Sequence, residues 1–209
     1  KENLIKALQK IIGVVEKRQT MPILSHILIR KNEDSCEVVA SDLEVQLTSD
    51  LSLEDGSNLA EDLTIPGRKL FDIGKGLPDD AVLEIEKEDE GKLKIKSKKS
   101  KFILSALDAK TFPLMETEEE NSVNFSLKSN DFKDIVQKTS FAMAQQDVRY
   151  YLNGMLLEIE GNKINGVATD GHRLALSSTR TNAADLDVRN ILPRKAVLEL
   201  SKLLSPNEG

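Results

Sequence analysis

The sequence is poor in the side chains that most often carry catalysis or covalent cross-links. Its 209 residues include no tryptophan, two histidines and one cysteine, Cys36, and aromatic residues make up 4%. A single cysteine excludes a disulfide within the chain and fits a reducing compartment, so we expect a cytoplasmic protein. No apolar run approaches the roughly 18 residues of a membrane span and no signal peptide is visible, so we expect no membrane partner.

Motifs for nucleotide, metal or nucleophile chemistry are missing as well. The chain has no phosphate-binding loop, no dinucleotide glycine pattern, no zinc-type spacing and no nucleophile elbow. His172 lies close to Asp170 and could act as a base with its orienting acid, which keeps an enzyme open as an alternative. A histidine in a turn is the more common explanation. We therefore expect no catalytic residue, no cofactor and no metal.

The chain does contain an internal repeat. One segment recurs after 128 positions: Val39-Ala40-Ser41-Asp42 matches Val167-Ala168-Thr169-Asp170. A second segment recurs with a drift of one or two residues from that offset: Ile65-Pro66-Gly67-Arg68-Lys69 matches Leu192-Pro193-Arg194-Lys195. A long period with matched segments indicates one structural unit used twice. Such a repeat suits a scaffold that presents the same surface repeatedly along a polymeric partner better than it suits a single active site.

This period predicts two domains, residues 1–120 and 121–209, joined by the acidic stretch 115–122. Apolar residues alternate over 123–127, just before a helical pattern, and this alternation predicts a strand. The counterpart of that strand would lie before Lys1. We therefore expect domain 1 to lack its first strand and domain 2 to be incomplete at its C-terminal end, as in a piece of a longer protein.

Periodicity predicts the same order of elements in both halves. Apolar residues recur with a helical period over 2–15, 67–76, 130–145 and 194–204. The period drops to two, as in strands, over 27–29, 37–39, 43–47, 81–86, 92–97, 101–107, 155–159, 163–168 and 173–177. We therefore expect an α+β fold of repeated domains, each an antiparallel sheet with two helices on one face.

The charge is segregated between helices and the rest of the chain. The net charge is −6, but the predicted helical segments 1–18, 66–77, 128–149 and 193–203 together carry +8, which leaves −14 elsewhere. Lysine and arginine bind phosphates independently of sequence, and no helix is suited to reading bases. The pattern favours non-specific binding of double-stranded DNA by the helices. A protein-docking module that never encircles DNA is the second alternative.

Four strings carry a resemblance to a known family, the bacterial DNA polymerase III β subunit or sliding clamp. They are Met21–Leu24, Ile65–Lys69, Gln146–Met155 and Val167–Leu174, and the resemblance runs through the whole chain in order. It implies a non-catalytic processivity factor, a homodimeric ring of three similar domains per protomer that encircles DNA, with helices lining the hole and sheets outside. The chain would cover most of domain 1 and two thirds of domain 2, with domain 3 absent.

The resemblance also implies three sets of functional residues. Contacts to DNA would come from Arg18, Gln146, Tyr150 and Tyr151, with Lys195 as a weaker candidate. The positive charge of the helices, rather than the resemblance, adds Lys6, Lys10, Lys133 and Lys138. A hydrophobic peptide motif of the polymerase α subunit, the clamp loader, and repair and translesion polymerases would bind a groove walled by Leu152, Thr169, Gly171, His172, Arg173 and Leu174. The dimer interface would use Lys69, Ile73, Phe102 and Leu104.

Overall fold

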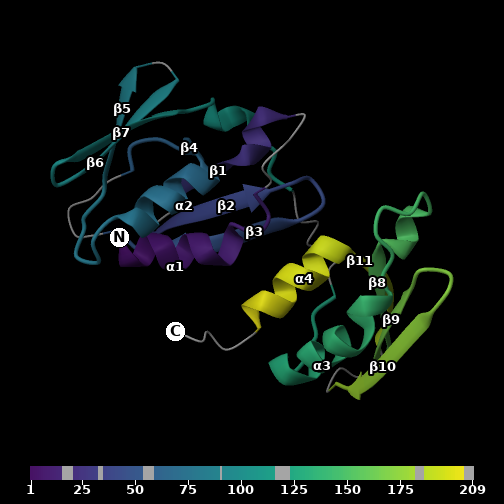
Figure 1. Cartoon of the computed structure of the whole chain (residues 1–209). Helices are drawn as coiled ribbons and strands as arrows, with labels where there is room; N and C mark the ends of the chain where they lie inside the picture. The colour runs from purple at the N-terminus through teal and green to yellow at the C-terminus, as the bar shows by residue number, and fades with distance from the viewer. Residues whose placement is uncertain are drawn as a thin grey trace. The chain divides into compact units, whose positions relative to one another are not determined.

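The computed structural model consists of two compact units, Lys1–Glu116 and Thr117–Gly209 (Figure 1). The boundary between them falls within the acidic stretch 115–122. The described residues are 1–15, 21–32, 35–53, 59–89, 91–115, 123–181 and 186–204. Arg18, one of the expected DNA contacts, lies outside them.

The described residues of the first unit form two α-helices and two antiparallel sheets. Its elements in chain order are α1 (Glu2–Ile11), the 3-10 turn η1 (Pro22–Ser25), β1 (His26–Asn32), β2 (Ser35–Ser41), β3 (Gln46–Leu51), β4 (Leu63–Pro66), α2 (Gly67–Gly76), β5 (Glu84–Asp89), β6 (Lys92–Ser97), β7 (Ser100–Ser105) and the 3-10 turn η2 (Ala109–Thr111). The sheets have the strand orders β3-β2-β1-β4 and β5-β6-β7.

The second unit repeats the first half of this arrangement. Its elements are α3 (Ser129–Thr139), the 3-10 turns η4 (Ser140–Ala142) and η5 (Tyr150–Leu152), β8 (Gly154–Gly161), β9 (Lys163–Thr169), β10 (Leu174–Arg180), β11 (Leu186–Pro193) and α4 (Arg194–Leu203). The strands form one antiparallel sheet in the order β10-β9-β8-β11, which matches β3-β2-β1-β4 strand for strand.

The two copies also share their strand register. Leu28 pairs with Val39 in the first unit, and Leu156 pairs with Val167 in the second, each residue displaced by 128. The offset becomes 127 at the edge strand, where Pro66 and Pro193 take equivalent places. The repeat predicted from the sequence is therefore a repeat of backbone pairing.

In each unit the helices pack against one face of the four-stranded sheet. In α1 the buried residues Leu4, Ala7, Leu8 and Ile11 recur at the spacing of a single helix face. They meet β2 and β3, while α2 covers β1 and β4. In the second unit α3 presses so closely on β9 that a Cβ at Gly166 would lie 2.2 Å from Ile135, so this position requires glycine.

In each unit an arginine at the start of the second helix donates hydrogen bonds to carbonyl groups of the segment that follows the first helix. Arg68 donates through Nε and Nη2 to the carbonyl of Val15, at 3.0 and 2.6 Å. In the second unit Arg194, one position earlier in its helix, donates through Nη1 to the carbonyls of Met143 and Ser140, at 3.3 and 3.5 Å. Both arginines therefore have a structural role.

Several expected boundaries were wrong. The first helices end at Ile11 and Thr139, because the apolar residues after them are buried in turns that prolong the helical pattern. Residues 43–45 form a turn, so β3 begins at Gln46. The edge strands β4 and β11 were not expected at all, because each runs directly into a helix start. Residues 123–127 form no strand.

Candidate partner-binding and DNA-facing sites

A tight turn joins β9 to β10 at the edge of the second sheet. The Asp170 carboxylate accepts hydrogen bonds from the backbone N–H groups of His172 and Arg173, both at 3.0 Å, and these bonds lower its pKa. Thr169 accepts from the Gly171 N–H at 3.1 Å. Gly171 has φ +88°, in the left-handed region that glycine adopts without strain. The turn is thus held by local bonds that are made only in this conformation.

A second loop packs against this turn. Asp147 and Asn153 exchange two hydrogen bonds between side chain and backbone, both at 2.9 Å. The Asp147 carboxylate also binds Arg149 in a bidentate manner, at 3.0 and 2.9 Å, and this pairing lowers the pKa of Asp147 to about 2. A Cβ at Gly171 would lie 3.2 Å from Nη2 of Arg149. The two loops therefore form one surface.

The side chains on this surface are large and mostly exposed. Leu174 is 65% exposed, and Tyr150 and Tyr151 are both exposed with their rings in a T-shaped arrangement, 6.0 Å between centroids. Arg173 lies over the exposed ring of Phe141 at 5.6 Å. Leu152 is buried, so it can only support the surface from below. Of the residues expected for the groove wall, Thr169, Gly171, His172, Arg173 and Leu174 thus lie on the turn, and Leu152 belongs to the neighbouring loop.

Sequence reasoning missed three residues of this surface: Asp147, Arg149 and Phe141. The first two lie inside the quoted string Gln146–Met155, and their spacing of two residues was a usable signal for a local ion pair. Phe141 gave no such signal, because it extends the apolar pattern of the preceding helix by one turn.

The first unit has the same turn with different side chains. Asp42 accepts from the N–H groups of Glu44 and Val45, at 3.0 and 2.8 Å, and Leu43 has φ +76°. However, Val45, the counterpart of the exposed Arg173, is only 7% exposed, and Ile23 is 6% exposed whereas its counterpart Tyr151 is 50% exposed. The shared backbone therefore presents aromatic and cationic groups only in the second unit.

The outer sheet faces differ in the same way. In the first unit Phe112 packs over Leu28 and Val39, together with Leu24 and Ile23, in one buried cluster. In the second unit a cross-strand row of Leu176, Val167, Leu156 and Ile191 occupies the equivalent face. Both end residues of this row are exposed and the middle two are half-buried. An apolar surface therefore continues from Leu174 across the sheet.

The lysines expected to contact DNA lie on the helices. Lys6 and Lys10 are exposed on α1, and Lys6 also pairs with Glu2 at 2.6 Å. On α3, Lys138 is exposed and pairs with Asp134 at 3.1 Å, while Lys133 is half-buried. Lys195 is half-buried in the first turn of α4. Gln146 is exposed with φ +57°. Within each unit the lysines belong to the helical layer, whereas Gln146 lies in the loop that follows η4.

The residues expected at the dimer interface lie at one end of the first unit's second sheet and on α2. The strand β7 is an edge strand of its sheet. Phe102 is half-buried and Leu104 is 8% exposed, so Leu104 offers little side-chain surface to a partner. On α2, Lys69 is exposed and Ile73 is half-buried.

Nothing in the geometry supports catalysis at His172. The Asp170 carboxylate accepts hydrogen bonds from two backbone N–H groups and, at 2.8 Å, from Nε of Arg173. It therefore does not orient the exposed imidazole of His172. The described residues contain no group of three or more potential metal ligands. In the same part of the chain no helix is long and apolar enough to cross a membrane.

Comparison with solved structures first gives the class of protein, a DNA polymerase sliding clamp. The DNA polymerase III β subunit of Pseudomonas aeruginosa superimposes with a TM-score of 0.89 at 44% identity, covering 100% of this chain and 56% of that one. The sliding clamp of Caulobacter crescentus gives 0.87 at 32% identity, covering 97% and 55%.

Sequence comparison then gives the family. The family model of the DNA polymerase III beta subunit, N-terminal domain, matches residues 1–116, and the model of its central domain matches 126–209. The chain belongs to this family. It is 46% identical to the beta sliding clamp of Pseudomonas aeruginosa over 210 residues and 38% identical to that of Escherichia coli over 213, and it spans 56% of the length of each. The resemblance and the α+β class expected from the sequence are confirmed.

Proposed function

We propose that the chain forms the first two domains of a ring-shaped sliding clamp, a non-catalytic processivity factor of DNA replication that acts in the cytoplasm. The complete homodimer would encircle duplex DNA without sequence specificity. It would tether the α subunit of the replicative polymerase, the clamp loader, and repair and translesion polymerases through a hydrophobic peptide motif. Family membership and the position of both matching models along the chain support this function.

The observation that carries the proposal is the divergence of side chains on a duplicated backbone. Equivalent turns have the same hydrogen bonds, yet Arg173, Leu174 and Tyr151 are exposed in the second unit, where the first unit has Val45, Gln46 and Ile23. Folding does not require this difference, because the first unit adopts the same turn without these residues. Binding of an apolar, partly anionic peptide would account for it.

The helices provide the surface that we propose contacts DNA. Lysines on α1 and α3 can bind backbone phosphates and release counterions, so each lost contact lowers the slope of log K against log salt by about 0.9. We would replace Lys6, Lys10 and Lys138 by Glu and measure binding of a fluorescent duplex by anisotropy at several salt concentrations. The affinity and the salt slope are both expected to fall.

A control triple variant keeps the change in net charge equal. Lys92, Lys99 and Lys163 are exposed at strand ends and turns, away from the helices. Their replacement by Glu is expected to leave most of the affinity intact. Equal losses in both variants would mean that only net charge matters, and this would remove the proposed DNA face. A docking module that never meets DNA would show no measurable binding in the parent chain.

The peptide site has a matched control in the duplicated unit. Leu174→Ala removes an exposed apolar side chain beside Arg173, and Gln46→Ala makes the equivalent change in the first unit. With a hydrophobic peptide from a polymerase III α subunit as probe, calorimetry is expected to show a loss of about 1–2 kcal/mol for Leu174→Ala only. Equal affinity in the two variants would exclude this wall.

A further inference from the structure

One large aromatic side chain of the second unit is left in solvent beside the proposed peptide site. Phe141 lies in η4, the 3-10 turn that follows α3, and it is 57% exposed. The two residues after it, Ala142 and Met143, are buried in the core. These neighbours anchor the turn, so the ring of Phe141 adds little to the stability of the fold.

The backbone that carries Phe141 is nevertheless held on both sides. Arg194 donates through Nη1 to the carbonyls of Ser140 and Met143, which flank Phe141, at 3.5 and 3.3 Å. The N–H of Met143 also donates to the carbonyl of Ser140 at 3.3 Å and closes the turn. An exposed ring on a restrained backbone can hold a neighbouring group in place.

The group next to the ring is the guanidinium of Arg173. Its Cζ lies 5.6 Å from the centroid of the Phe141 ring, within the range in which an aromatic face attracts a cation. Nε of Arg173 donates to Oδ2 of Asp170 at 2.8 Å. Nη1 and Nη2 make no hydrogen bond to any residue that the structure describes. Two contacts therefore restrain the guanidinium and leave its outer N–H groups available to a ligand.

The first unit lacks both partners of this contact. The 128-residue offset places Gly13 at the position of Phe141 and Val45 at that of Arg173. The match is in register, because the two residues that follow Gly13 are buried like those that follow Phe141. The two units thus share these turns, while the ring and the cation occur together in the second unit only. Folding of the turns does not require the pair.

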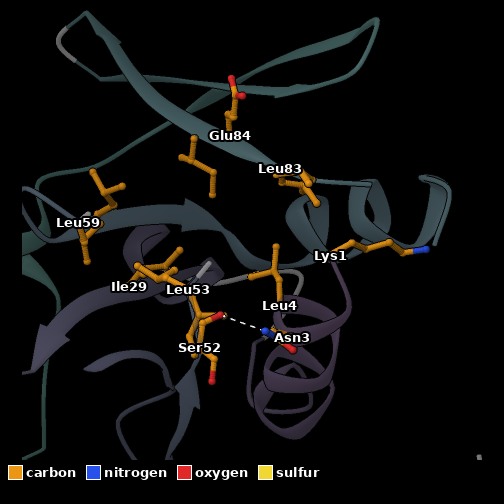
Figure 2. Close-up of a pocket in the computed structure, with 13 residues that line it drawn as sticks. Lys1, Asn3, Leu4, Ile29, Ser52, Leu53, Leu59, Leu83 and Glu84 are labelled. Atoms are coloured by element: carbon orange, nitrogen blue, oxygen red, sulfur yellow. Dashed lines mark hydrogen bonds between the residues drawn. The ribbon is translucent and has the colours of Figure 1, made fainter. Parts of the chain in front are cut away.

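A recess of about 420 Å³ in the first unit shows the opposite arrangement (Figure 2). Its described lining is mostly aliphatic and includes one basic residue, Lys1. Nζ of Lys1 already donates to the carbonyl of Leu77 at 2.6 Å and to the carboxylate of Asp79 at 2.9 Å. The recess thus has apolar surface with a cation that is bonded within the unit. In the second unit the exposed Leu174 lies beside a cation that still has N–H groups for a ligand.

We propose that Phe141 is a positioning residue of the peptide site, and that the guanidinium it restrains binds an acidic group of the peptide. This inference rests on the proposed function, because it concerns the same site. Leu174 receives an apolar side chain of the peptide, so the acidic group belongs next to that side chain in the peptide sequence. A carboxylate forms short, charge-assisted hydrogen bonds with a guanidinium. Without the ring, Arg173 is held by Asp170 alone, and binding must immobilise a more mobile side chain.

Two substitutions separate the ring from its apolar bulk. Phe141→Leu keeps an apolar side chain without a ring, and Phe141→Tyr keeps the ring. The probe is a hydrophobic peptide of a polymerase III α subunit, made with either Asp or Asn beside its apolar motif. In calorimetry the parent chain should prefer the Asp peptide. Phe141→Leu should weaken binding of the Asp peptide about twofold to fivefold and leave the Asn peptide unchanged, whereas Phe141→Tyr should behave like the parent.

The Nε–H proton of Arg173 gives a second measurement that needs no peptide. Its exchange with water, followed by NMR, should be several-fold faster in Phe141→Leu than in the parent chain and in Phe141→Tyr. The Nε–H of Arg149, which is bonded to Asp147, provides the control and should exchange at one rate in all three proteins. Urea denaturation establishes that the variants are as stable as the parent.

Several results would overturn this role of Phe141. An equal loss of affinity for the two peptides in Phe141→Leu would mean that the ring contributes only apolar surface. Equal losses in Phe141→Leu and Phe141→Tyr, or unchanged exchange of the Arg173 proton in Phe141→Leu, would mean that the ring does not restrain the guanidinium. If the parent chain bound neither peptide, the proposed function itself would be contradicted. The same preference for Asp in the parent and in Phe141→Leu would contradict only the present inference.

Discussion

At the scale of single residues, the same left-handed backbone conformation is adopted by a leucine in one unit and by a glycine in the other. Leu43 and Gly171 occupy the same position in matched turns, with φ +76° and +88°. Leucine is strained in the left-handed region because its Cβ approaches the following carbonyl, whereas glycine is not. In the second unit a Cβ would also approach Arg149. The first unit therefore tolerates a strain that the second unit avoids.

Reciprocal substitutions at these positions should have opposite effects on stability. Gly171→Ala introduces the left-handed penalty and the contact with Arg149, so the free energy of unfolding should fall by about 1–2 kcal/mol. Leu43→Gly relieves strain and removes a side chain that is half in solvent, so stability should rise by up to about 1 kcal/mol. Urea denaturation measures both. Changes of the same sign would contradict this account of the turns.

His26 makes the stability of the first unit depend on pH. The imidazole is buried at the start of β1, with Nδ1 3.2 Å from the Pro22 carbonyl, and burial lowers its pKa below the usual value of about 6.5. Because the unfolded chain then binds a proton more readily, the contribution of His26 is complete above about pH 6.5 and is lost as the pH falls below it.

Thermal unfolding between pH 7.5 and 5.5 tests this dependence. The midpoint of the parent chain should fall across this range, and His26→Leu should reduce the fall. An equal slope in the parent and in His26→Leu would show that other groups cause the dependence.

At the scale of elements, Arg68 and Arg194 hold the helices of each unit together. Arg194→Ala leaves the carbonyls of Ser140 and Met143 without this donor and should cost about 1–3 kcal/mol. Arg68→Ala should have a similar effect on the first unit, and in the double variant each unit should show its own loss unchanged, because the residues belong to different units. Arg180→Ala, at an exposed strand end, serves as the control. Urea denaturation of the single and double variants gives the comparison.

Much of the element order could be predicted from the sequence, because the repeat constrains every element twice. The strand β6 matched its expected range, and α2 and α4 followed their prolines as expected. The edge strands β4 and β11 were missed because pairing with β1 and β8 is a tertiary property with no periodic signal. For residues 123–127 the periodic signal was present but the strand was not. An alternating pattern gives a strand only where the edge of a sheet is available for pairing.

The candidate site was predictable in part. Thr169, Gly171, His172, Arg173 and Leu174 came from one string, and the structure places them in one turn. Leu152 was expected as part of the apolar floor of the groove, and it lies buried in the 3-10 turn η5, which the sequence pattern did not predict. The link from Asp147 through Arg149 to Gly171 joins loops more than 20 residues apart, so sequence periodicity could not reveal it.

At the scale of the whole molecule, the two units should unfold separately, with the second less stable. Phe112 covers the outer apolar row of the first unit, whereas the equivalent row of the second unit ends in exposed Leu176 and Ile191. Calorimetry should therefore show two transitions. Ile159→Ala should shift only the lower one and Ile27→Ala only the upper one, by about 2–5 kcal/mol each. A single transition, or a shift of both by either variant, would contradict this expectation.

The lone thiol of the chain has a practical consequence for such measurements. Cys36 lies on β2, where it is buried, and burial raises its pKa, so the thiolate that reacts with alkylating reagents is scarce in the folded protein. Alkylation must wait for β2 to open. The labelling rate therefore reports the opening of the first unit alone, without an engineered probe and without interference from the second unit.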